Sequence, residues 1–575
     1  MVKFYFRALV GIIFLLTPER SFLQNSDAPK SLGNTYFIKN CFVVQKPGIV
    51  LSGQNVLIKD GFISDISPSS KPPFDAQIIQ ADSMYVYAGF IDGFSNIGIS
   101  KPESKDRPKL PDPGNPPNDL AGITPQNSSL DSYKSSDKSV SDMRSAGFVI
   151  SNVAPRGLML PGQCNLILLG DESADKLLVK AKTGQTFQLE SNRGIYPATI
   201  IGVMAKFREI YKNASIAGNQ EAKYKANPSG LMRPDFSREL MAMYPVTTQK
   251  MPLFFVTQKT KDVHKALSLK EELGFDLILT EVKQGWHYID KIKKTNTRVL
   301  LSLDLPEIEK KKAKSETAKD SLSTKKDSVS TKELEKVEKN PEKEAFDVKK
   351  EQSIKEYLSQ AALFEKQGIL FGFSFLNVKS SDIKNNIRTL IENGLSEDAA
   401  LAALTTNPAQ ILGINNVSGT VEKGKIANLI ITDKPYFNEK SAVKYTFVDG
   451  RKYEYQEKKK QENKPTEAGK FIGTWTYTVE VPGSVQKGKI VITKSAGEYM
   501  IKVFDNSSPG EEDVANNISV NENSVTFNII ADMGQPVKVD FDLKFAEKAY
   551  SGSVSVGEFG TFPIKGEYEG EPKLF

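Results

Sequence analysis

The stretch 419-GTVEKGKIANLIITDKP-435 decides the fold, because it is a β segment that comes very late in the chain. It alternates in short strands, as do 445-YTFVDGRKYEY-455 and residues 35–67, with glycines marking the turns. Between these β patches, apolar strand candidates such as 276-DLILTEV-282 alternate with amphipathic helices such as 286-WHYIDKIKKT-295. Such alternation over about 300 residues predicts a parallel α/β architecture, and a (β/α)8 TIM-like barrel has the right size.

The composition is that of a globular protein with more than one domain. The 575 residues correspond to roughly two to four domains. The net charge of +6, from 76 basic and 70 acidic residues, is too balanced for a nucleic-acid-binding face. The two cysteines, Cys41 and Cys164, are compatible with one disulfide, but they are too few for a disulfide framework or a cysteine-based zinc motif.

The first residues read as an export signal. Lys3 and Arg7 precede an apolar run over residues 8–16, and a small-x-small site at 26–28 predicts a signal peptide spanning residues 1–28. A competing end lies at 21-SFLQ-24, and a buried N-terminal strand or helix is the alternative. The run is shorter than the roughly 20 apolar residues that cross a bilayer. We therefore expect an exported chain, periplasmic, at the outer surface or extracellular, with no transmembrane segment after signal removal.

Two segments interrupt the strand–helix pattern. Residues 101–135 are rich in Pro, Asp, Asn and Ser and predict a long surface loop. Residues 307–350 are rich in Lys, Glu and Ser, with no aromatic residue before Phe346. Such a segment cannot bury enough apolar surface to offset its ordering entropy, so a disordered insertion, or at most fraying helix, is expected. It would be either a polyelectrolyte tether or a solvated insertion.

The last part of the chain has a different pattern. After a polar linker over residues 456–469, period-2 alternation with Gly and Asn turns predicts an antiparallel sandwich or small barrel over residues 470–575. Its opening, Gly473-Thr474-Trp475, resembles the Gly-x-Trp start of lipocalin-like domains. An aromatic residue that opens a strand can also be simply part of the core.

Four stretches resemble the amidohydrolase superfamily, nearest its imidazolonepropionase and prolidase-like branch. The first, 88-AGFIDGFSNIGI-99, is similar to the motif Pro-Gly-Phe-Ile-Asp-x-His-x-His, and 419–435 is similar to Gly-x-Leu-x-x-Gly-Lys-x-Ala-Asp-Leu. The others are 142-DMRSAGFVISNV-153 and 394-GLSEDAALAALTTNPAQILGI-414. The resemblance implies a barrel over residues 88–415 and a small β sandwich built from both ends of the module, residues 29–87 and 416–455.

The family's chemistry requires a divalent metal, usually zinc, which lowers the pKa of a bound water and polarises the scissile carbonyl. Its ligands are His-x-His on the first strand, single histidines on the fifth and sixth, and an aspartate on the eighth. The matching positions here are Phe94, Asn96, Thr257, Glu281 and Ser374. As a set they are not ligand-like, so no cofactor is expected. A hard-cation site of Glu281, Asn96 and waters is the alternative.

The census of histidines agrees, because the whole chain has two, His264 and His287. His264 lies within a helical pattern, whereas His287 follows the sixth strand and is nearer the expected barrel mouth. Glu281 and His287 are the only candidates for catalysis. Asp92, within Gly-Phe-Ile-Asp, is expected to be structural.

Three functions remain open. The first is a non-catalytic binding or assembly scaffold, the front half of a two-part amidohydrolase whose active half is a separate chain. The second is a hydrolase of peptide or non-peptide C–N bonds with an altered site, in which a carboxylate such as Glu281 supplies acid–base chemistry. The third is an exported small-molecule-binding protein. A shared fold does not choose among them.

Overall fold

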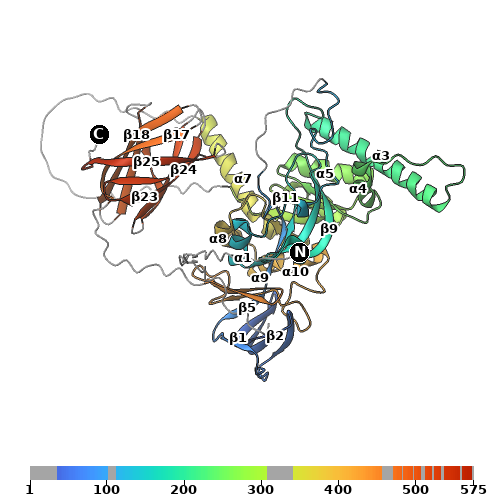
Figure 1. Cartoon of the computed structure of the whole chain (residues 1–575), viewed down its shortest axis with the longest axis horizontal. Coiled ribbons are helices and arrows are strands. Elements are labelled where there is room, and N and C mark those ends of the chain that lie inside the picture. The colour runs from blue at the N-terminus through green and yellow to red at the C-terminus, as the bar shows by residue number, and fades with distance from the viewer. Residues whose placement is uncertain are drawn as a thin grey trace, which may run out of the picture. The chain divides into compact units, whose positions relative to one another are not determined.

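The computed structural model describes residues 35–101, 112–306 and 341–455, and 471–572 except for short gaps (482–483, 496–497, 507–511, 521–522, 533–535 and 557–559) (Figure 1). The chain divides into two compact units, Met1–Gln456 and Glu457–Phe575. The expected signal peptide and linker, and residues 307–340 of the expected insertion, lie outside the described residues.

Unit 1 contains an eight-stranded sheet built from both ends of the module. Its order is β16-β15-β14-β5-β1-β2-β3, with β4 paired to β1. The key contact is antiparallel pairing of β14 with β5, where Leu429 lies opposite Ala88. The sheet has its own core, which includes the fully buried Val56, Val86 and Phe447. The strands are β1 (Tyr36–Lys46), β2 (Ile49–Lys59), β3 (Phe62–Ser67), β4 (Gln77–Gln80), β5 (Tyr85–Ala88), β14 (Leu429–Thr432), β15 (Val443–Val448) and β16 (Arg451–Glu454).

The second sheet of unit 1 is the barrel, in the order β6 to β13. Its two end strands meet, because the Phe375 amide donates to the Phe94 carbonyl at 3.0 Å. The strands are β6 (Phe90–Ser95), β7 (Phe148–Val153), β8 (Gly162–Leu168), β9 (Leu178–Gln188), β10 (Leu253–Val256), β11 (Leu277–Val282), β12 (Arg298–Ser302) and β13 (Phe371–Ser374). The TIM-like barrel and the sheet from both ends are as predicted.

One barrel strand departs from the all-parallel pattern. β8 runs antiparallel to both of its neighbours, β7 and β9, whereas the other neighbouring pairs in this sheet are parallel. The reason is the connection. A parallel return needs a crossover of a dozen or more residues, and only residues 154–161, without a helix, separate β7 from β8.

Amphipathic helices cover the barrel. In α5 (Thr260–Leu273), Val263, Ala266 and Leu267 are buried, and the helix ends at Gly274 with a left-handed φ of 79°. The other helices are η1 (Ser129–Asp131), α1 (Lys138–Ser145), α2 (Ala174–Leu177), η2 (Trp286–Tyr288), α6 (Ile289–Lys294), α8 (Ser380–Glu392), α9 (Glu397–Leu404) and α10 (Thr406–Leu412). Among the described helices, none combines the length and apolar character needed to span a bilayer.

Of two further helical features, the first was not anticipated. Helices α3 (Ile200–Ala226) and α4 (Arg238–Thr247) form a hairpin between β9 and β10 that projects from the barrel (Figure 1). Helix α7 (Pro341–Lys366) takes in residues 341–350, so these last residues of the expected insertion are helical, which was the alternative to disorder. Its later turns bury Leu358 and Phe364, and this packing stabilises a helix in whose first turns Phe346 and Val348 are exposed.

Unit 2 is an antiparallel nine-stranded sheet, as predicted, in the order β20-β19-β18-β17-β25-β24-β23-β22-β21. Trp475 is buried at its centre, and the indole N–H donates to the Phe471 carbonyl at 3.0 Å. Its strands are β17 (Gly473–Val481), β18 (Ser484–Ser495), β19 (Glu498–Asp505), β20 (Asp513–Val514), β21 (Asn516–Val520), β22 (Ser524–Asp532), β23 (Pro536–Ala546), β24 (Ala549–Val556) and β25 (Gly560–Gly570).

The two cysteines are not joined. Cys41 lies in the sheet built from both ends and Cys164 lies in the barrel, and both are buried free thiols. Burial raises the pKa of each thiol to about 12. The disulfide that the sequence left open is therefore absent, and neither thiol is a reactive group in the folded chain.

Candidate functional site

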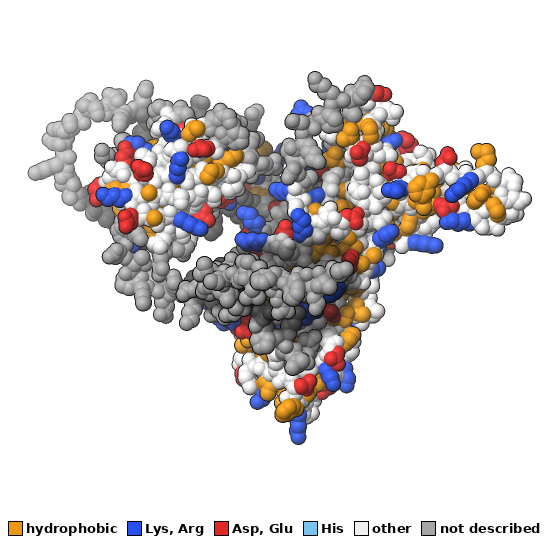
Figure 2. Space-filling model, viewed as in Figure 1, with side chains coloured by type: hydrophobic (Ala, Val, Ile, Leu, Met, Phe, Trp, Pro, Cys, Tyr) orange, Lys and Arg blue, Asp and Glu red, His pale blue; other side chains and the backbone are white. Residues whose placement is uncertain are grey.

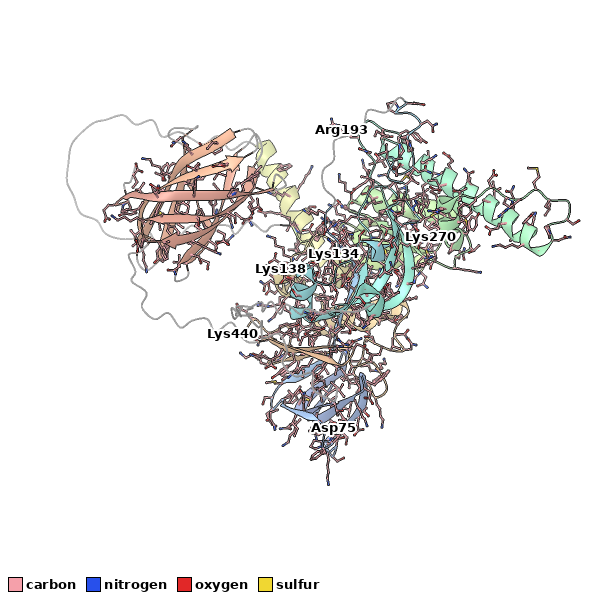
Figure 3. All side chains as sticks on the ribbon, in the orientation of Figure 1. Asp75, Lys134, Lys138, Arg193, Lys270 and Lys440 are labelled. Carbon is pink, nitrogen blue, oxygen red and sulfur yellow. The ribbon has the colours of Figure 1, made fainter. Side chains whose placement is uncertain are left out.

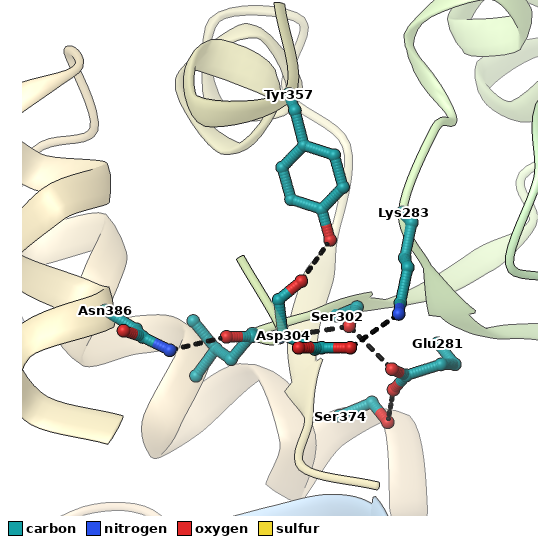
Figure 4. A network of polar contacts seen from close by, with 8 residues as sticks. Glu281, Lys283, Ser302, Asp304, Tyr357, Ser374 and Asn386 are labelled. Carbon is teal, nitrogen blue, oxygen red and sulfur yellow. Dashed lines mark hydrogen bonds and ion pairs between the residues drawn. The ribbon is translucent and has the colours of Figure 1, made fainter. Parts of the chain in front are cut away.

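The barrel interior brings Glu281 together with two serines from the following strands. Glu281 lies near the end of β11 and is 0% exposed. The Ser302 hydroxyl, from β12, donates to one carboxylate oxygen at 2.6 Å, and the Ser374 hydroxyl, from β13, donates to the other at 2.6 Å (Figure 4). Both oxygens of Glu281 are thus engaged by protein hydroxyls.

The backbone at Glu281 has an unusual conformation. Its φ is 55°, in the left-handed region that a residue with a Cβ rarely adopts. The register between β11 and β12 also shifts between Leu279 and Val282, which marks an extra residue on β11. Bulges of this kind re-aim a side chain. Here the bulge lies at the residue whose carboxylate points into the barrel interior, Glu281.

Burial determines the acidity of this group. It raises the pKa of the Glu281 carboxyl, and the hydrogen bonds from Ser302 and Ser374 oppose that effect. The carboxyl is sealed from water, so it can reach no substrate without a rearrangement of the barrel.

A polar network extends from Glu281 to the barrel rim (Figure 4). The Asp304 amide donates to the Ser302 hydroxyl at 3.1 Å, and the Lys283 ammonium pairs with the Asp304 carboxylate at 2.6 Å. The Tyr357 hydroxyl from α7 donates to the Asp304 carbonyl at 2.8 Å. The segment after β12 is therefore tied both to β11 and to α7.

A second buried carboxyl, Asp92, lies on β6. It accepts hydrogen bonds from the hydroxyls of Ser95 and Ser151 and, at 2.9 Å, from the Phe94 amide. Burial raises its pKa to about 6, against the effect of these donors. All of these donors lie on β6 and β7. The carboxyl therefore links two neighbouring strands, as a structural group does.

The side chains at the remaining positions that match the family's ligands also pack against or hydrogen-bond to other parts of the chain. Phe94 is 1% exposed and its ring centroid lies 5.7 Å from that of Phe254. The Asn96 amide donates to the Ala154 carbonyl at 2.8 Å, and the Thr257 hydroxyl donates to the Thr280 carbonyl at 3.2 Å. Ser374 also lies 3.1 Å from the Phe94 carbonyl, so its one proton has two possible acceptors.

The two histidines lie apart from this cluster. His264 is on the exposed side of α5, where its Nδ1 lies 3.0 Å from the Ser268 hydroxyl. His287 is exposed on η2, with its ring 5.5 Å from that of Trp286. The structure thus brings Glu281, Ser374 and Phe94 together, but it does not bring His287 to Glu281.

These residues do not fit a bound divalent metal. A catalytic site needs about three protein ligands and one open position for water. Here the carboxylate oxygens of Glu281 are taken by serine hydroxyls, and an aromatic ring stands where the first histidine is expected. Over residues 35–101, 112–306, 341–455 and the described parts of unit 2, no group of three His, Cys, Asp or Glu side chains could hold a metal.

Several cavities lie among the loops that follow the barrel strands, and two of them are lined in part by Asn96. One, of about 230 Å³, lies above Phe94 and is lined by polar residues that include Gln188, Glu190 and Asn377. Burial raises the pKa of the Glu190 carboxyl. The other, of about 860 Å³, lies between α1 and the start of α8. Enzymes with this barrel carry out their chemistry at this end of the strands.

Sequence reasoning placed Glu281 and Ser374 near the ends of the sixth and eighth barrel strands, but it missed Ser302. Nothing in 298-RVLLSLDLP-306 marks one serine as the partner of a carboxylate 21 positions earlier. Only the pairing of β11 with β12 reveals it. The same holds for Tyr357, whose helix follows an insertion.

Comparison with known proteins agrees with the fold. Residues 306–453 match the family model described as Amidohydrolase family. An amidohydrolase from Thermotoga maritima MSB8 superposes with a TM-score of 0.57 at 19% sequence identity, covering 73% of this chain and 100% of that one. A prolidase complexed with N-methylphosphonate-L-proline covers 73% of this chain and 100% of its own at 15% identity, with a TM-score of 0.42. A search of the curated proteins returns no match.

Residues 306–453 thus resemble the Amidohydrolase family, and the likeness to the Thermotoga maritima structure supports the fold: a barrel with a sheet built from both ends of the module.

Proposed function

We propose that this chain is an exported, non-catalytic amidohydrolase-like protein that acts as a binding or assembly scaffold. The single observation that carries the proposal is the hydrogen bonding of Glu281: each of its two carboxylate oxygens accepts a hydrogen bond from a serine inside the barrel. A catalytic carboxylate needs access to a substrate or to a metal-bound water. This one is closed off from both.

Phe94 supports the same reading. An aromatic ring in contact with Phe254 contributes to the packing of the barrel core, and it offers no lone pair to a cation. A ring at this position fills barrel space in which the family's ligands would otherwise hold an ion, and close packing of this kind is what a protein interior requires.

The partner we propose is a separate catalytic amidohydrolase chain. The support is the fold itself, together with a second unit that has its own core and could present or orient a neighbour. Such a complex would bury about 1,600 Å² or more in total. Export is supported by Lys3, Arg7 and the apolar run that follows them.

The first test is the metal content of the purified chain, measured by elemental mass spectrometry after gentle purification and again after incubation with Zn²⁺. We expect no stoichiometric metal and no hydrolysis of dipeptides or cyclic amides in either state. About one Zn, Fe or Mn per chain, removable by a chelator together with activity, would contradict the proposal.

The second test addresses the partner. The tagged chain is purified from its own cells, and any bound chain is identified by mass spectrometry, expressed alone and mixed with it. We expect an amidohydrolase with an intact ligand set that forms a complex of defined stoichiometry. Recovery of the chain alone under several mild conditions would argue for a function without a catalytic partner.

Small-molecule binding is the second candidate, and the polar cavity above Phe94 favours it. A saturating ligand would raise the melting temperature according to RT ln(1 + [L]/Kd). The Gln188→Ala and Asn377→Ala variants should reduce that shift if the cavity is the site. The hydrolase alternative has less support, because Glu281 is inaccessible.

A further inference from the structure

The α3–α4 hairpin extends well beyond the barrel that carries it. Helix α3 has 27 residues, about 40 Å at 1.5 Å per residue, and all of its buried residues lie between Val203 and Ala214. From residue 215 to residue 242 no residue is buried. The distal half therefore adds no core to the barrel. Figures 1 and 3 show it standing clear of the rest of unit 1.

The end of this hairpin, residues 222–238, is called the hairpin tip here. It exposes three large apolar side chains within six positions: Leu231, Met232 (91% exposed) and Phe236 (74% exposed). Surface apolar residues that occur singly are ordinary. Three of them on one protruding loop mark an interaction site.

Exposed cations lie in the same segment as these apolar side chains. The hairpin tip contains Lys223, Lys225, Arg233 and Arg238, all exposed, against the single carboxylate Asp235, so its net charge is +3. Two further carboxylates flank it: Glu221 pairs with Lys225 at 2.5 Å, and Glu239 accepts a hydrogen bond from Ser237 at 2.9 Å. Residues 221–239 together carry a net charge of +1, and Lys223, Arg233 and Arg238 are the exposed cations that contribute most to it. Figure 2 shows orange and blue side chains together along the projecting hairpin.

We propose that the hairpin tip docks onto an anionic lipid surface, with Leu231, Met232 and Phe236 entering the headgroup region and the cations of the same segment contacting lipid phosphates. The charge of the tip complements such a surface, and apolar groups beside Lys and Arg are the composition of interfacial anchors, which bury about 5–10 Å deep.

The shape of the tip favours lipid over a protein partner. A stable protein complex buries about 800 Å² on each side over a broad patch, whereas the exposed apolar groups here occupy one short protruding loop. Pro228 and Pro234 also remove two backbone N–H donors from it, so less polar backbone has to be desolvated on insertion. The proposal does not depend on whether the barrel is catalytic.

The test is sedimentation of the full chain with vesicles of phosphatidylethanolamine and phosphatidylglycerol, compared with vesicles of phosphatidylcholine alone. We expect binding to the anionic vesicles that weakens as salt rises, since screening shortens the range of the attraction. The Met232→Ser/Phe236→Ser variant should bind about tenfold or more weakly. The Arg233→Gln/Arg238→Gln variant should lose most of the dependence on salt.

The matched control is Phe74→Ser, which removes a fully exposed ring from the loop before β4 and should bind like the parent chain. All variants carry the same N-terminus, so differences among them come from the substitutions. Equal binding by the parent chain and the Met232→Ser/Phe236→Ser variant, or no binding by the parent chain, would overturn the proposal. A change in oligomeric state without vesicle binding would overturn it in favour of self-association.

Discussion

The hydroxyl of Ser374 donates a 2.6 Å hydrogen bond to the carboxylate of Glu281, across 93 positions of the chain and between two barrel strands that are not neighbours. Glu281 and Ser374 occupy the positions on the sixth and eighth strands that match metal ligands in the amidohydrolase resemblance. In this barrel, the side chains of the sixth and eighth strands contact each other directly through this hydrogen bond.

Replacing Glu281 tests whether its carboxylate stabilises the barrel interior. Glu281→Gln keeps the shape and one acceptor oxygen, so we expect a loss of about 1 kcal/mol in the free energy of unfolding. Glu281→Ala leaves the Ser302 hydroxyl without its acceptor beside a cavity, whereas Ser374 can still donate to the Phe94 carbonyl, so about 2–4 kcal/mol is expected. Urea denaturation measures both. Ser302→Ala/Ser374→Ala combined with Glu281→Ala should recover part of the loss, because the stranded Ser302 donor is then gone.

The ring of Phe94 should matter for stability as a core residue does. Phe94→Ala removes a buried ring from the barrel interior, and we expect a loss of about 3–5 kcal/mol. Phe74→Ala makes the same change at a fully exposed position and should alter stability by less than about 0.5 kcal/mol. If both variants melt like the parent chain, Phe94 is not packed as described.

Asp92 gives stability a dependence on pH. Its pKa is raised from 3.8 to about 6 by burial, so the folded state holds a proton that the unfolded state releases between those values. This contribution is fully present below pH 3.8 and is lost as pH rises through about 6. Over that window the parent chain should lose roughly 3 kcal/mol relative to Asp92→Asn, which lacks the titration.

The measurement is urea denaturation of both chains at several pH values, with the difference between them taken at each pH. Groups whose pKa is lowered on folding, such as Asp137, change stability in the opposite direction but equally in both chains. A constant difference between pH 4 and pH 7 would show that Asp92 does not titrate there.

Unit 2 should fold without unit 1. Its core consists of its own residues, and Trp475 packs against Phe545 and Tyr568 with ring centroids 4.8 and 5.1 Å away. A fragment of residues 470–575 should unfold cooperatively, with blue-shifted tryptophan emission before the transition. Trp475→Ala should cost about 3–5 kcal/mol and leave the fragment largely unfolded. A fragment that is unfolded without substitution would contradict this.

Much of the fold could be predicted because the periodicity of the sequence is strong where the core is large. Strand β11 lies within the predicted segment 276–282, and His264 lies in helix α5 as its helical pattern predicted, because apolar patterns reflect burial directly. The sequence of β8, GQCNLIL, carries no signal of strand direction, so its antiparallel course could not be predicted. The α3–α4 hairpin escaped notice because its distal half faces solvent.

The site was predictable in outline only. The position of Glu281 follows from its strand, but its left-handed backbone and its two serine donors depend on strand register. A register shift of one residue, as between β11 and β12, changes which side chains meet, and no local pattern in the sequence records it.

The pairing of β14 with β5 joins residues that are 341 positions apart, Leu429 and Ala88. At about 5–20 residues per second, ribosomal synthesis would need roughly 20–70 s to supply the second strand after the first. During that interval the edge of β5 has no neighbour on that side and is open to other strands. Nascent chains that stop before residue 429 should therefore depend on chaperones, and the full-length chain should be released from them only once β14 is in place.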